Sequence, residues 1–458
     1  MSRDLERSIG VRTAAGVVIA NMIGAGIFTT TGFQAADLGN PVYIYLLWIL
    51  GGVLALAGAL CYAELGAAIP RAGGEYAYLH ATYGGMLAFA SALVSLTAGF
   101  SAPIASALKG LTHYLQHFIP VLGSQEPVLG ALVAGDVFAI CAVWLLVAIH
   151  IGSTGFGLGV TNIVTALKVL GILLLVGGAL TIGNGDVESM VRASQTSDPK
   201  TGADLFGALA TSLIFVMFCY SGWNAASYLA GEMRAPERDL PRALLVGTAS
   251  VMVAYLALNL VYFYGASVDE LAGKVEVGLV ASENLFGSIG AGFVVLVLAV
   301  SLLASASAMT VVGPRVYYAL GQDFAPLGFL ARVNPTTGTP IVALTLQAAV
   351  TSIVILLGRV DQIQQYAGFT LSLMATLAVS CVIVLRLREP DLPRPFRVWG
   401  YPFTPLLFIG VSVWMMVWAF RGRPTESLLG LLTVATGCVI YRLAFRSYQR
   451  RHPNQPGD

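Results

Sequence analysis

The chain has 458 residues, of which 57% are hydrophobic and only 11% charged, and its mean hydropathy is +0.78. Soluble domains carry about 25% charged residues, so a soluble protein of this length would lack the polar side chains to cover its surface. The composition therefore predicts an integral membrane protein and excludes disordered, collagen-like and disulfide-rich secreted chains. With 25 Lys and Arg against 24 Asp and Glu, the net charge of +1 predicts no surface for nucleic acid.

Twelve apolar runs along the chain are long enough to cross a bilayer, which takes about 20 residues of helix because lipid satisfies no backbone group. We therefore expect an all-α integral membrane protein with twelve transmembrane helices. No long soluble domain separates them, and the polar outer segment Gly183–Asp204 is expected to be a mobile loop. The runs are Arg12–Ala35, Tyr43–Ile69, Gly84–Phe118, Leu129–Ile149, Leu158–Ile182, Leu205–Gly231, Ala243–Gly265, Gly290–Leu320, Ile341–Leu357, Tyr366–Leu387, Phe403–Phe420 and Leu428–Phe445.

The basic residues predict the orientation of these spans. An even number of spans puts both termini on one side, and cytoplasmic loops carry the excess of Lys and Arg. Seventeen of the 25 basic residues fall on the side of the termini, seven on the other side and one inside the fifth span. Both termini are therefore expected in the cytoplasm, although Arg421 and Arg423 fall on the disfavoured side. The charged start of the chain lacks the layout of a cleavable signal, so the first span is expected to be retained.

The cysteines indicate neither a metal site nor a disulfide framework. No two of them have CxxC spacing, and each lies in an apolar run. We expect buried free thiols that act as small apolar side chains. They are Cys61, Cys141, Cys219, Cys381 and Cys438.

The first span carries a pair of glycines near its centre, in the stretch Asn21–Phe28. Gly24 and Gly26 flank Ala25, and this loss of side-chain bulk favours an unwound segment. Close packing against another helix is the alternative, because small residues are enriched at membrane helix interfaces.

The sixth span repeats this anomaly with Ser221 and Gly222 in mid-membrane and Asn224 beside them. An asparagine in the hydrocarbon is costly unless it is paired or faces a cavity. The two interruptions occupy the first span of two successive five-span sets, and paired interrupted spans are the best sequence indicator of a transporter's substrate site. Because five is odd, the second set enters from the opposite side and the repeat is inverted.

An unwound segment determines what can bind there. It frees N–H groups at the start of the outer half-helix, where the helix dipole favours an anion. It also frees carbonyl groups at the end of the inner half-helix, which suit a cation. An α-amino acid fits both, although other zwitterions are not excluded.

Lys168 is the one basic residue deep within a span, ten residues from the start of its apolar run and roughly 15 Å from that end. An ionisable residue at this depth is a functional hypothesis by default. It could exchange a proton during transport, or it could stay charged against freed carbonyls as a substitute for a sodium ion. Both alternatives predict transport that does not need sodium.

Acidic residues are missing from the middle of every predicted span. Glu64 and Glu232 lie near cytoplasmic ends, and Glu283 precedes the eighth span. A cationic substrate side chain would normally need a buried carboxylate as its partner, so this pattern favours neutral substrates.

Several motifs, in order along the chain, resemble those of the amino acid–polyamine–organocation superfamily, and its L-type amino acid transporters in particular. Gly24-Ala25-Gly26-Ile27-Phe28 is similar to the GSGIF signature of the superfamily. The other matching stretches are Gly58–Gly66, Pro70–Leu79, Tyr220–Asn224 with Gly231-Glu232, Leu240–Ala243 and Arg394–Pro402.

The resemblance implies a leucine-transporter-type fold with two inverted five-helix repeats and two extra helices. The expected divisions are residues 1–182, the outer loop 183–204, residues 205–388, the extra helices 389–446 and the tail 447–458. It also implies substrate contacts: backbone amides at Ala25 and Gly26 for the carboxylate, with Gly24 shaping the turn. Carbonyls of Met22 or Ile23, and of Phe218, Cys219 and Ser221, would hold the amino group. Phe218 would be a gate, with Trp223 as a second gate candidate or a packing residue, and Lys168 matches the lysine of sodium-independent members.

Two departures from the family pattern affect selectivity and assembly. Ser221 stands where L-type members often have Gly, and Ala225 stands where many have tyrosine, which leaves side-chain selectivity open. Heteromeric animal members have a cysteine between the third and fourth spans. The loop Ile119–Pro127 has none, so no covalent heavy-chain partner is expected.

We therefore expect a sodium-independent transporter of neutral L-amino acids in the cell membrane, working by exchange or proton coupling, without cofactor or metal. The alternatives are an amino-acid sensor, or a cationic amino acid or polyamine transporter, on the same fold. An enzyme is not expected, because HExxH, GxSxG and paired intramembrane aspartates are all missing.

Overall fold

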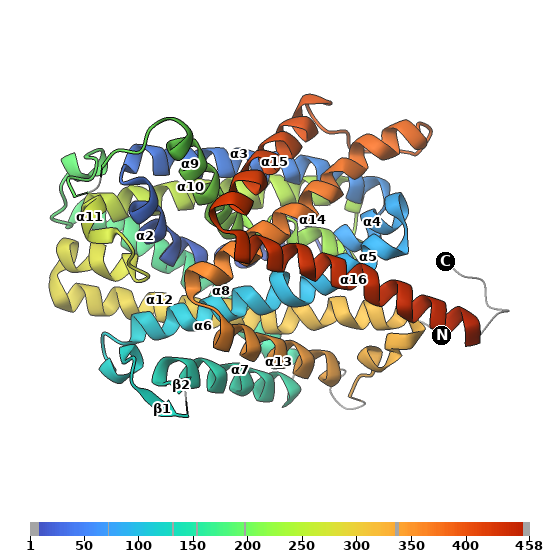
Figure 1. Cartoon of the computed structure of the whole chain (residues 1–458), viewed down its shortest axis with the longest axis horizontal. Helices are drawn as coiled ribbons and strands as arrows, with labels where there is room; N and C mark the ends of the chain where they lie inside the picture. Colours follow the sequence, from blue (N-terminus) through green and yellow to red (C-terminus); the bar gives the residue numbers. More distant parts are fainter. Residues whose placement is uncertain are drawn as a thin grey trace.

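Long helices lying side by side make up most of the computed structural model (Figure 1), which describes residues 9–71, 73–130, 132–152, 154–196, 198–334 and 339–451. The α-helices are α1 (Val11–Met22), α2 (Gly26–Leu38), α3 (Pro41–Ala68), α4 (Glu75–Tyr83), α5 (Gly85–Val94), α6 (Ala102–Leu115), α7 (Ala134–Gly152), α8 (Thr154–Thr181), α9 (Gly202–Tyr220), α10 (Pro236–Gly265), α11 (Val268–Leu271), α12 (Val277–Asp323), α13 (Ile341–Leu357), α14 (Val360–Arg388), α15 (Phe403–Gly422) and α16 (Pro424–Arg451). A π-helical segment, η1 (Ser95–Ser101), joins α5 to α6, and the 3-10 helices are η2 (Pro120–Gly123), η3 (Glu188–Met190), η4 (Ala225–Glu232) and η5 (Ala325–Ala331). The strands are β1 (Pro127–Leu129) and β2 (Leu132–Val133).

The helices have the length and composition of membrane spans. In the described part of the chain nine helices are long and apolar enough to cross a membrane, and the bent pair of α1 and α2 forms a tenth candidate. Two shorter apolar helices, Ala166–Thr181 and Ile341–Leu357, coincide with the predicted fifth and ninth runs. The chain is therefore a multi-pass α-helical membrane protein.

The start of the predicted fourth span is wrong. Leu129 lies in an antiparallel hairpin of β1 and β2, and the helix begins only at Ala134. The hairpin turns at Gly130, whose φ of +60° suits glycine, so the apolar residues before Ala134 form a turn at the start of α7 instead of extending the helix (Figure 1). The first part of the predicted fifth span, residues 158–165, belongs to α8, but the side chains there lie outside the described residues.

Side chains from distant parts of the sequence meet between the long helices. α10 packs along α3 and α1, and α12 packs along α6 and α8. α12 is interrupted near the predicted start of the eighth span, where Gly287 has a φ of +69°. The helices α3, α8, α10 and α12 therefore lie around the broken pair of α1 and α2.

Hydrogen bonds connect the described residues of the loop at 183–204, which the sequence predicts to be mobile, to neighbouring elements. The Asp269 carboxylate of α11 accepts from the Ser194 hydroxyl at 2.5 Å, and its other oxygen accepts from the Gln195 N–H at 3.0 Å. The Ser194 N–H donates to the Gly39 carbonyl at 2.7 Å, next to the end of α2. The loop therefore joins the end of the first broken span to the segment after α10.

At the end of the bundle where α1 begins, the Arg394–Pro402 motif packs onto α3 and α14. Glu64 is 2% exposed and accepts two hydrogen bonds from Arg386, at 2.8 and 2.5 Å. It also accepts from the Val398 N–H at 2.7 Å, and Arg394 lies 3.6 Å away. A buried carboxylate must be paired in this way, so Glu64 explains why a basic motif follows α14.

The prediction of buried thiols holds for three of the five cysteines. Cys61, Cys219 and Cys381 are buried and unoxidised. Cys141 is exposed and Cys438 half-buried, because each lies on a helix at the rim of the bundle, where an apolar thiol can face lipid.

Candidate functional site

The first span is broken in its middle, as predicted. α1 ends at Met22, α2 begins at Gly26, and the two helices meet at an angle of 41°. The first N–H groups of α2 have no intrahelical partner of the α type, and the Phe28 N–H instead bonds to the Ala25 carbonyl at 3.0 Å. The start of α2 therefore presents backbone donors at the break.

The sixth span is broken as well, and its break lies against the first. α9 ends at Tyr220, the chain turns through Ser221–Asn224, and η4 continues the span. Gly222 has a φ of +94°, and a Cβ there would lie 3.0–3.1 Å from backbone and side-chain atoms of Asn21. Only glycine fits this conformation and this close approach.

The sequence-predicted contact residues gather at the junction of the two breaks. Gly24, Ser221, Asn21 and Asn224 are all half-buried, although they lie at the centre of the bundle. The remaining predicted contact residues are buried: Met22, Ile23, Ala25, Gly26, Phe218 and Cys219. A small accessible surface therefore lies where backbone groups of both spans are released from helical hydrogen bonding.

Lys168 on α8 reaches the first break. Its Nζ donates to the Ile23 carbonyl at 2.9 Å and to the Ser305 hydroxyl of α12 at 2.5 Å, and it lies 3.5 Å from the Ala20 carbonyl. The Ser305 hydroxyl donates to the same Ile23 carbonyl at 3.0 Å. Because an ammonium has three donors, these three acceptors can satisfy it, and the side chain is 2% exposed.

Tyr255 of α10 links the two breaks, a role that the sequence did not reveal. Its hydroxyl lies within hydrogen-bonding distance of the Met22 carbonyl and 3.0 Å from the Cys219 carbonyl. With a single proton it donates to one of them at a time. The sequence does not distinguish a tyrosine that bonds to an unwound backbone segment from one that only packs within an apolar span.

A polar face on α2 binds the neighbouring helices, and it too was missed. Thr29, Thr30 and Thr31 are fully buried, and Gln364 of α14 donates to Thr29 at 2.7 Å while it accepts from Thr30 at 3.0 Å. Thr31 donates to the Asn259 side chain of α10 at 2.7 Å. Three successive threonines in an apolar run were the available signal, since buried polar groups in lipid must be paired.

Gly26 is a packing glycine as well as the first residue of α2. A Cβ at this position would lie 2.5 Å from the Cys219 sulfur and 3.1 Å from the Cys219 Cα. Gly24, in contrast, has room: its added Cβ would meet only the Met22 carbonyl, at 3.8 Å. The two glycines therefore differ, and close helix packing, the alternative to a functional break, applies to Gly26.

The two predicted gate aromatics occupy different places. Phe218 lies in the last turn of α9, at the break, and is 5% exposed. The Trp223 ring packs edge-on against Tyr62 of α3 at 4.6 Å and against Phe408 of α15 at 6.3 Å. A Cβ on Gly58 would touch the Trp223 ring at 2.8 Å. These contacts favour the packing alternative for Trp223.

A buried carboxyl group that belongs to no predicted span, that of Glu75, lies beside the sixth break. Glu75 begins α4, in the connection between the second and third spans, and is 5% exposed. One of its oxygens accepts from the Tyr62 hydroxyl at 2.9 Å and lies 3.5 Å from the Asn224 amide nitrogen. The other accepts from the Tyr228 hydroxyl at 3.4 Å. Counting acids only within spans missed Glu75, because its connecting segment folds inward.

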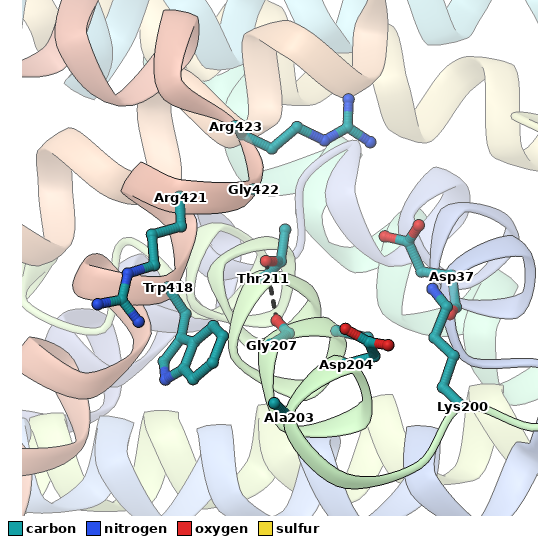
Figure 2. A pocket seen from close by; sticks show the side chains of 11 residues that line it. Asp37, Lys200, Ala203, Asp204, Gly207, Thr211, Trp418, Arg421, Gly422 and Arg423 are labelled. Carbon is teal, nitrogen blue, oxygen red and sulfur yellow. Dashed lines mark hydrogen bonds between the residues drawn. The ribbon is translucent and has the colours of Figure 1, made fainter.

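A charged cavity of about 480 Å³ opens at the opposite end of α9 (Figure 2). Lys200, Arg421 and Arg423 give it positive charge, and Asp37 and Asp204 give it negative charge. About ten residues of helix, roughly 15 Å, separate it from the break. Arg421 and Arg423, the exceptions to the charge rule, therefore lie at a cavity mouth. The other lining residues are Ala203, Gly207, Ala208, Thr211, Trp418 and Gly422.

Metal chemistry has no support among the residues that the structure describes, where no group of three His, Cys, Asp or Glu side chains could hold an ion. What the geometry offers is backbone donors and acceptors, one buried ammonium and one buried carboxyl group. Such an arrangement can bind a small zwitterion, because it offers donors for a carboxylate and acceptors for an ammonium.

The described residues thus define a multi-pass helical membrane protein with two interrupted spans that meet. The chain belongs to the amino acid permease family, whose model matches residues 9–440. It is 28% identical over 448 residues to the large neutral amino acids transporter small subunit 2 of Rattus norvegicus, covering 96% of this chain and 81% of that protein. It is 27% identical over 440 residues to the Asc-type amino acid transporter 1 of Mus musculus, covering 96% and 81%. It is 30% identical over 426 residues to the serine/threonine exchanger SteT of Bacillus subtilis (strain 168), covering 90% and 91%.

Proposed function

We propose that this protein is a sodium-independent secondary transporter of neutral L-amino acids that works by alternating access. The observation that carries the proposal is the junction of the two breaks, with Lys168 bonded to the Ile23 carbonyl. The names of the relatives support the substrate class, since they describe transporters of large neutral amino acids and an exchanger of serine and threonine.

The fold proposed for this function has twelve transmembrane helices in two inverted five-helix repeats, with α15 and α16 as the two extra helices. The nine long helices, the bent pair and the two shorter apolar helices supply that number. We propose residues 1–182 and 205–388 as the repeats, 183–204 as the outer loop, 389–446 as the extra helices and 447–458 as the tail. Residues 452–458 of that tail lie outside the described part of the chain. The excess of basic residues on the side of the termini supports a cytoplasmic position for both termini.

The substrate carboxylate is proposed to bind the N–H groups at the start of α2, around Ala25 and Gly26, with Gly24 shaping the approach. Helix N-termini favour anions both by their free donors and by the helix dipole. Gly24 is half-buried and has open space beside it, which supports its place at the accessible surface of the break.

The substrate ammonium is proposed to bind carbonyl groups released by the breaks, some of which already have side-chain partners. The Met22, Ile23 and Cys219 carbonyls already lie near side-chain donors from Tyr255, Lys168 and Ser305. A carbonyl oxygen has two lone pairs, so each can accept a substrate proton only as a second partner. The carbonyls of Phe218 and Ser221 complete the proposed set, and Ser221 is half-buried at the accessible surface.

Phe218 is proposed as the gate over the substrate. Its position in the last turn of α9 supports this, because movement of the break would move its ring. Trp223 is proposed to hold η4 against α3 and α15 through its contacts with Tyr62 and Phe408, which would couple the gate to the surrounding helices.

Of the two roles considered for Lys168, the geometry supports a permanently charged substitute for a sodium ion. Its three donors have three acceptors, two of them carbonyls of the first span. A neutral amine would lose these charge-assisted bonds, which are roughly twice as strong as neutral ones.

The described loop between α6 and α7 supports independence from a covalently bound partner. Residues 119–127 contain no cysteine, so no disulfide to a second chain can form there. The rat relative is named as a small subunit, and the present chain is proposed to work without a covalently attached heavy chain.

Uptake of labelled amino acid into proteoliposomes tests the function. A transporter accumulates label or exchanges it for internal amino acid, whereas a sensor on the same fold would bind the amino acid without flux. A cationic amino acid or polyamine transporter remains the second candidate, because buried Glu75 could accept a cationic side chain. Competition by serine, leucine, arginine and spermidine separates these substrate classes.

A further inference from the structure

Glu75 is a buried acid whose described partners are all uncharged. The Tyr62 hydroxyl is 2.9 Å and the Asn224 amide 3.5 Å from one oxygen, and the Tyr228 hydroxyl is 3.4 Å from the other. The buried acid at the end of α3, Glu64, instead has two arginines. Because no positive charge among these partners stabilises the carboxylate, Glu75 can exist in either protonation state.

The chain is shaped to bring Glu75 to this place. Gly73 and Gly74 precede it with φ values of +113° and +52°, a conformation that side chains rarely adopt. A Cβ on Gly74 would lie 2.7 Å from the Ser227 hydroxyl and 3.0 Å from the Tyr228 ring. The close approach of the α4 start to η4 therefore requires glycine, and it places the carboxyl group directly against the sixth span.

Two opposing effects act on the charge of Glu75. Its position in the first turn of α4 favours the carboxylate, because the helix dipole is positive there. Burial raises the pKa of the Glu75 carboxyl, and the hydrogen bonds from Tyr62 and Tyr228 offset this only in part. Burial is the largest of these effects, so the proton is bound more tightly here than in water.

The titratable groups that face the Glu75 carboxyl directly are three phenols. Tyr62 faces the carboxyl from α3, Tyr228 faces it from η4, and Tyr78 of α4 lies next to it. α14, which packs against α4, contributes the Cys381 thiol at the Tyr78 carbonyl and the Arg388 guanidinium, which donates to the Thr82 carbonyl at 3.2 Å, near the far end of α4. Phenols and thiols are neutral at physiological pH, so the charge of this cluster is the charge of Glu75. Both states can be satisfied, because a phenol hydroxyl can donate to a carboxylate or accept from a carboxylic acid.

Movement of η4 would change the environment of this acid. Asn224 is the last residue of the break, and Tyr228 lies one turn further along η4. At its far end η4 is joined to the start of the first span, where the Ile9 N–H donates to the Glu232 carbonyl at 3.0 Å. If α1 and η4 swing away together during transport, Glu75 loses its partners and meets water.

We propose that Glu75 is a proton-binding site that couples transport to protons: it binds a proton while η4 is packed against it and releases it when η4 moves away. The coupling follows from linkage, because a site that binds a proton differently in two conformations shifts the balance between them. This inference rests on the proposed function, since it makes the transporter proton-coupled. It assigns the proton to Glu75 and leaves Lys168 permanently charged.

The test compares Glu75→Gln with Glu389→Gln in proteoliposomes across roughly pH 5 to 8. The Glu75→Gln side chain keeps the shape of the glutamic acid and mimics its protonated form, whereas Glu389 is an exposed acid at the end of α14 and serves as the control. Wild type and the control should accumulate neutral amino acid when a proton gradient is imposed. Glu75→Gln should lose this accumulation and its pH dependence while it still exchanges internal for external amino acid.

Tyr62→Phe provides a second variant with a predicted sign. It removes the shortest hydrogen bond to the carboxylate, which stabilises the charged form, so the pH midpoint of uptake should rise by about one unit. An unchanged midpoint in Tyr62→Phe, or gradient-driven accumulation by Glu75→Gln, would contradict the proposal. Wild-type uptake of arginine that is lost in Glu75→Gln would instead assign Glu75 to a cationic substrate.

Infrared difference spectroscopy on purified protein tests the site without any flux. The proposal predicts a protonated-carboxyl band that titrates between roughly pH 5 and 8 in wild type and is missing in Glu75→Gln. A Glu75 that stays charged through this range overturns the proposal even if transport is confirmed. If no amino acid moves in any variant, the proposed function fails, and the band still reports the protonation of Glu75.

Discussion

Replacing Lys168 removes the cation that holds the first break. In Lys168→Ala the Ile23 carbonyl loses the bond from Nζ at 2.9 Å and keeps only the Ser305 hydroxyl, and the Ala20 carbonyl loses its side-chain partner. The break should therefore become less ordered, and the substrate must restore that order when it binds.

The size of the effect follows from the bonds that are lost. A hydrogen bond to a charged group contributes about 1.5–3 kcal/mol, and 1.4 kcal/mol corresponds to a factor of about ten in affinity. If the free energy needed to reorder the break on binding equals the contribution of one such bond, Lys168→Ala should weaken amino acid binding by about 10- to 100-fold. Ser305→Ala removes a neutral donor to the Ile23 carbonyl and also an acceptor of the Lys168 ammonium, so it should weaken binding by roughly tenfold.

Equilibrium binding of labelled amino acid to purified protein measures this effect, with thermal unfolding as a check on folding. Lys168→Met keeps most of the side-chain volume and separates loss of charge from loss of packing. Lys109→Ala is the matched control, because Lys109 also bonds to a carbonyl, that of Ile355 at 3.0 Å, and to Asp136 at 2.6 Å, away from the breaks. Affinity of Lys168→Met within about twofold of wild type would refute the reasoning.

Three further predictions concern the breaks and the loop at residues 183–204. Gly26→Ala should lower both thermal stability and uptake, because its Cβ meets the Cys219 sulfur, and Cys219→Ala should partly restore both; no restoration would mean that the clash is not the cause. Phe218→Ala should reduce transport more than binding, since a gate controls occlusion, whereas an equal loss of both would indicate direct contact with the substrate. Hydrogen bonds from Ser194, Gln195 and Thr196 lower the pKa of the Asp269 carboxyl. The charged carboxylate therefore stabilises the loop fully at pH values above the ordinary pKa of about 3.9, and this stabilisation is lost as the pH falls through the lowered pKa. Asp269→Asn should therefore increase proteolysis of the loop at residues 183–204 at neutral pH, and an unchanged rate would contradict this role.

The breaks could be predicted because their signal is local. The sequence alone predicts an interrupted helix at two places: at Gly24 and Gly26 in one span, and at Ser221 and Gly222 in another. The depth of Lys168 followed from counting residues along an apolar run. The structure brings these three features together: the two breaks correspond in the two halves of the chain, and Lys168 bonds to a carbonyl freed by the first break.

What the sequence could not provide depends on contacts between distant segments. Glu75 was assigned to a connection between spans, and only the folded chain brings it to Asn224, 149 positions further on. Tyr255 and Trp223 show the same limit. The sequence around an aromatic residue in an apolar run is the same whether its side chain bonds to a broken helix or packs against a neighbouring helix. The hairpin before Ala134 was missed because its short strands are as apolar as the helix that follows.

The most direct test of the central claim is the initial rate of neutral amino acid uptake into proteoliposomes with all sodium replaced by choline. If the two breaks form the substrate site and Lys168 occupies the place of a sodium ion, serine or leucine uptake should be saturable and equal in rate with and without sodium. A strict requirement for sodium would contradict the role of Lys168, and binding without flux would show that the protein is not a transporter.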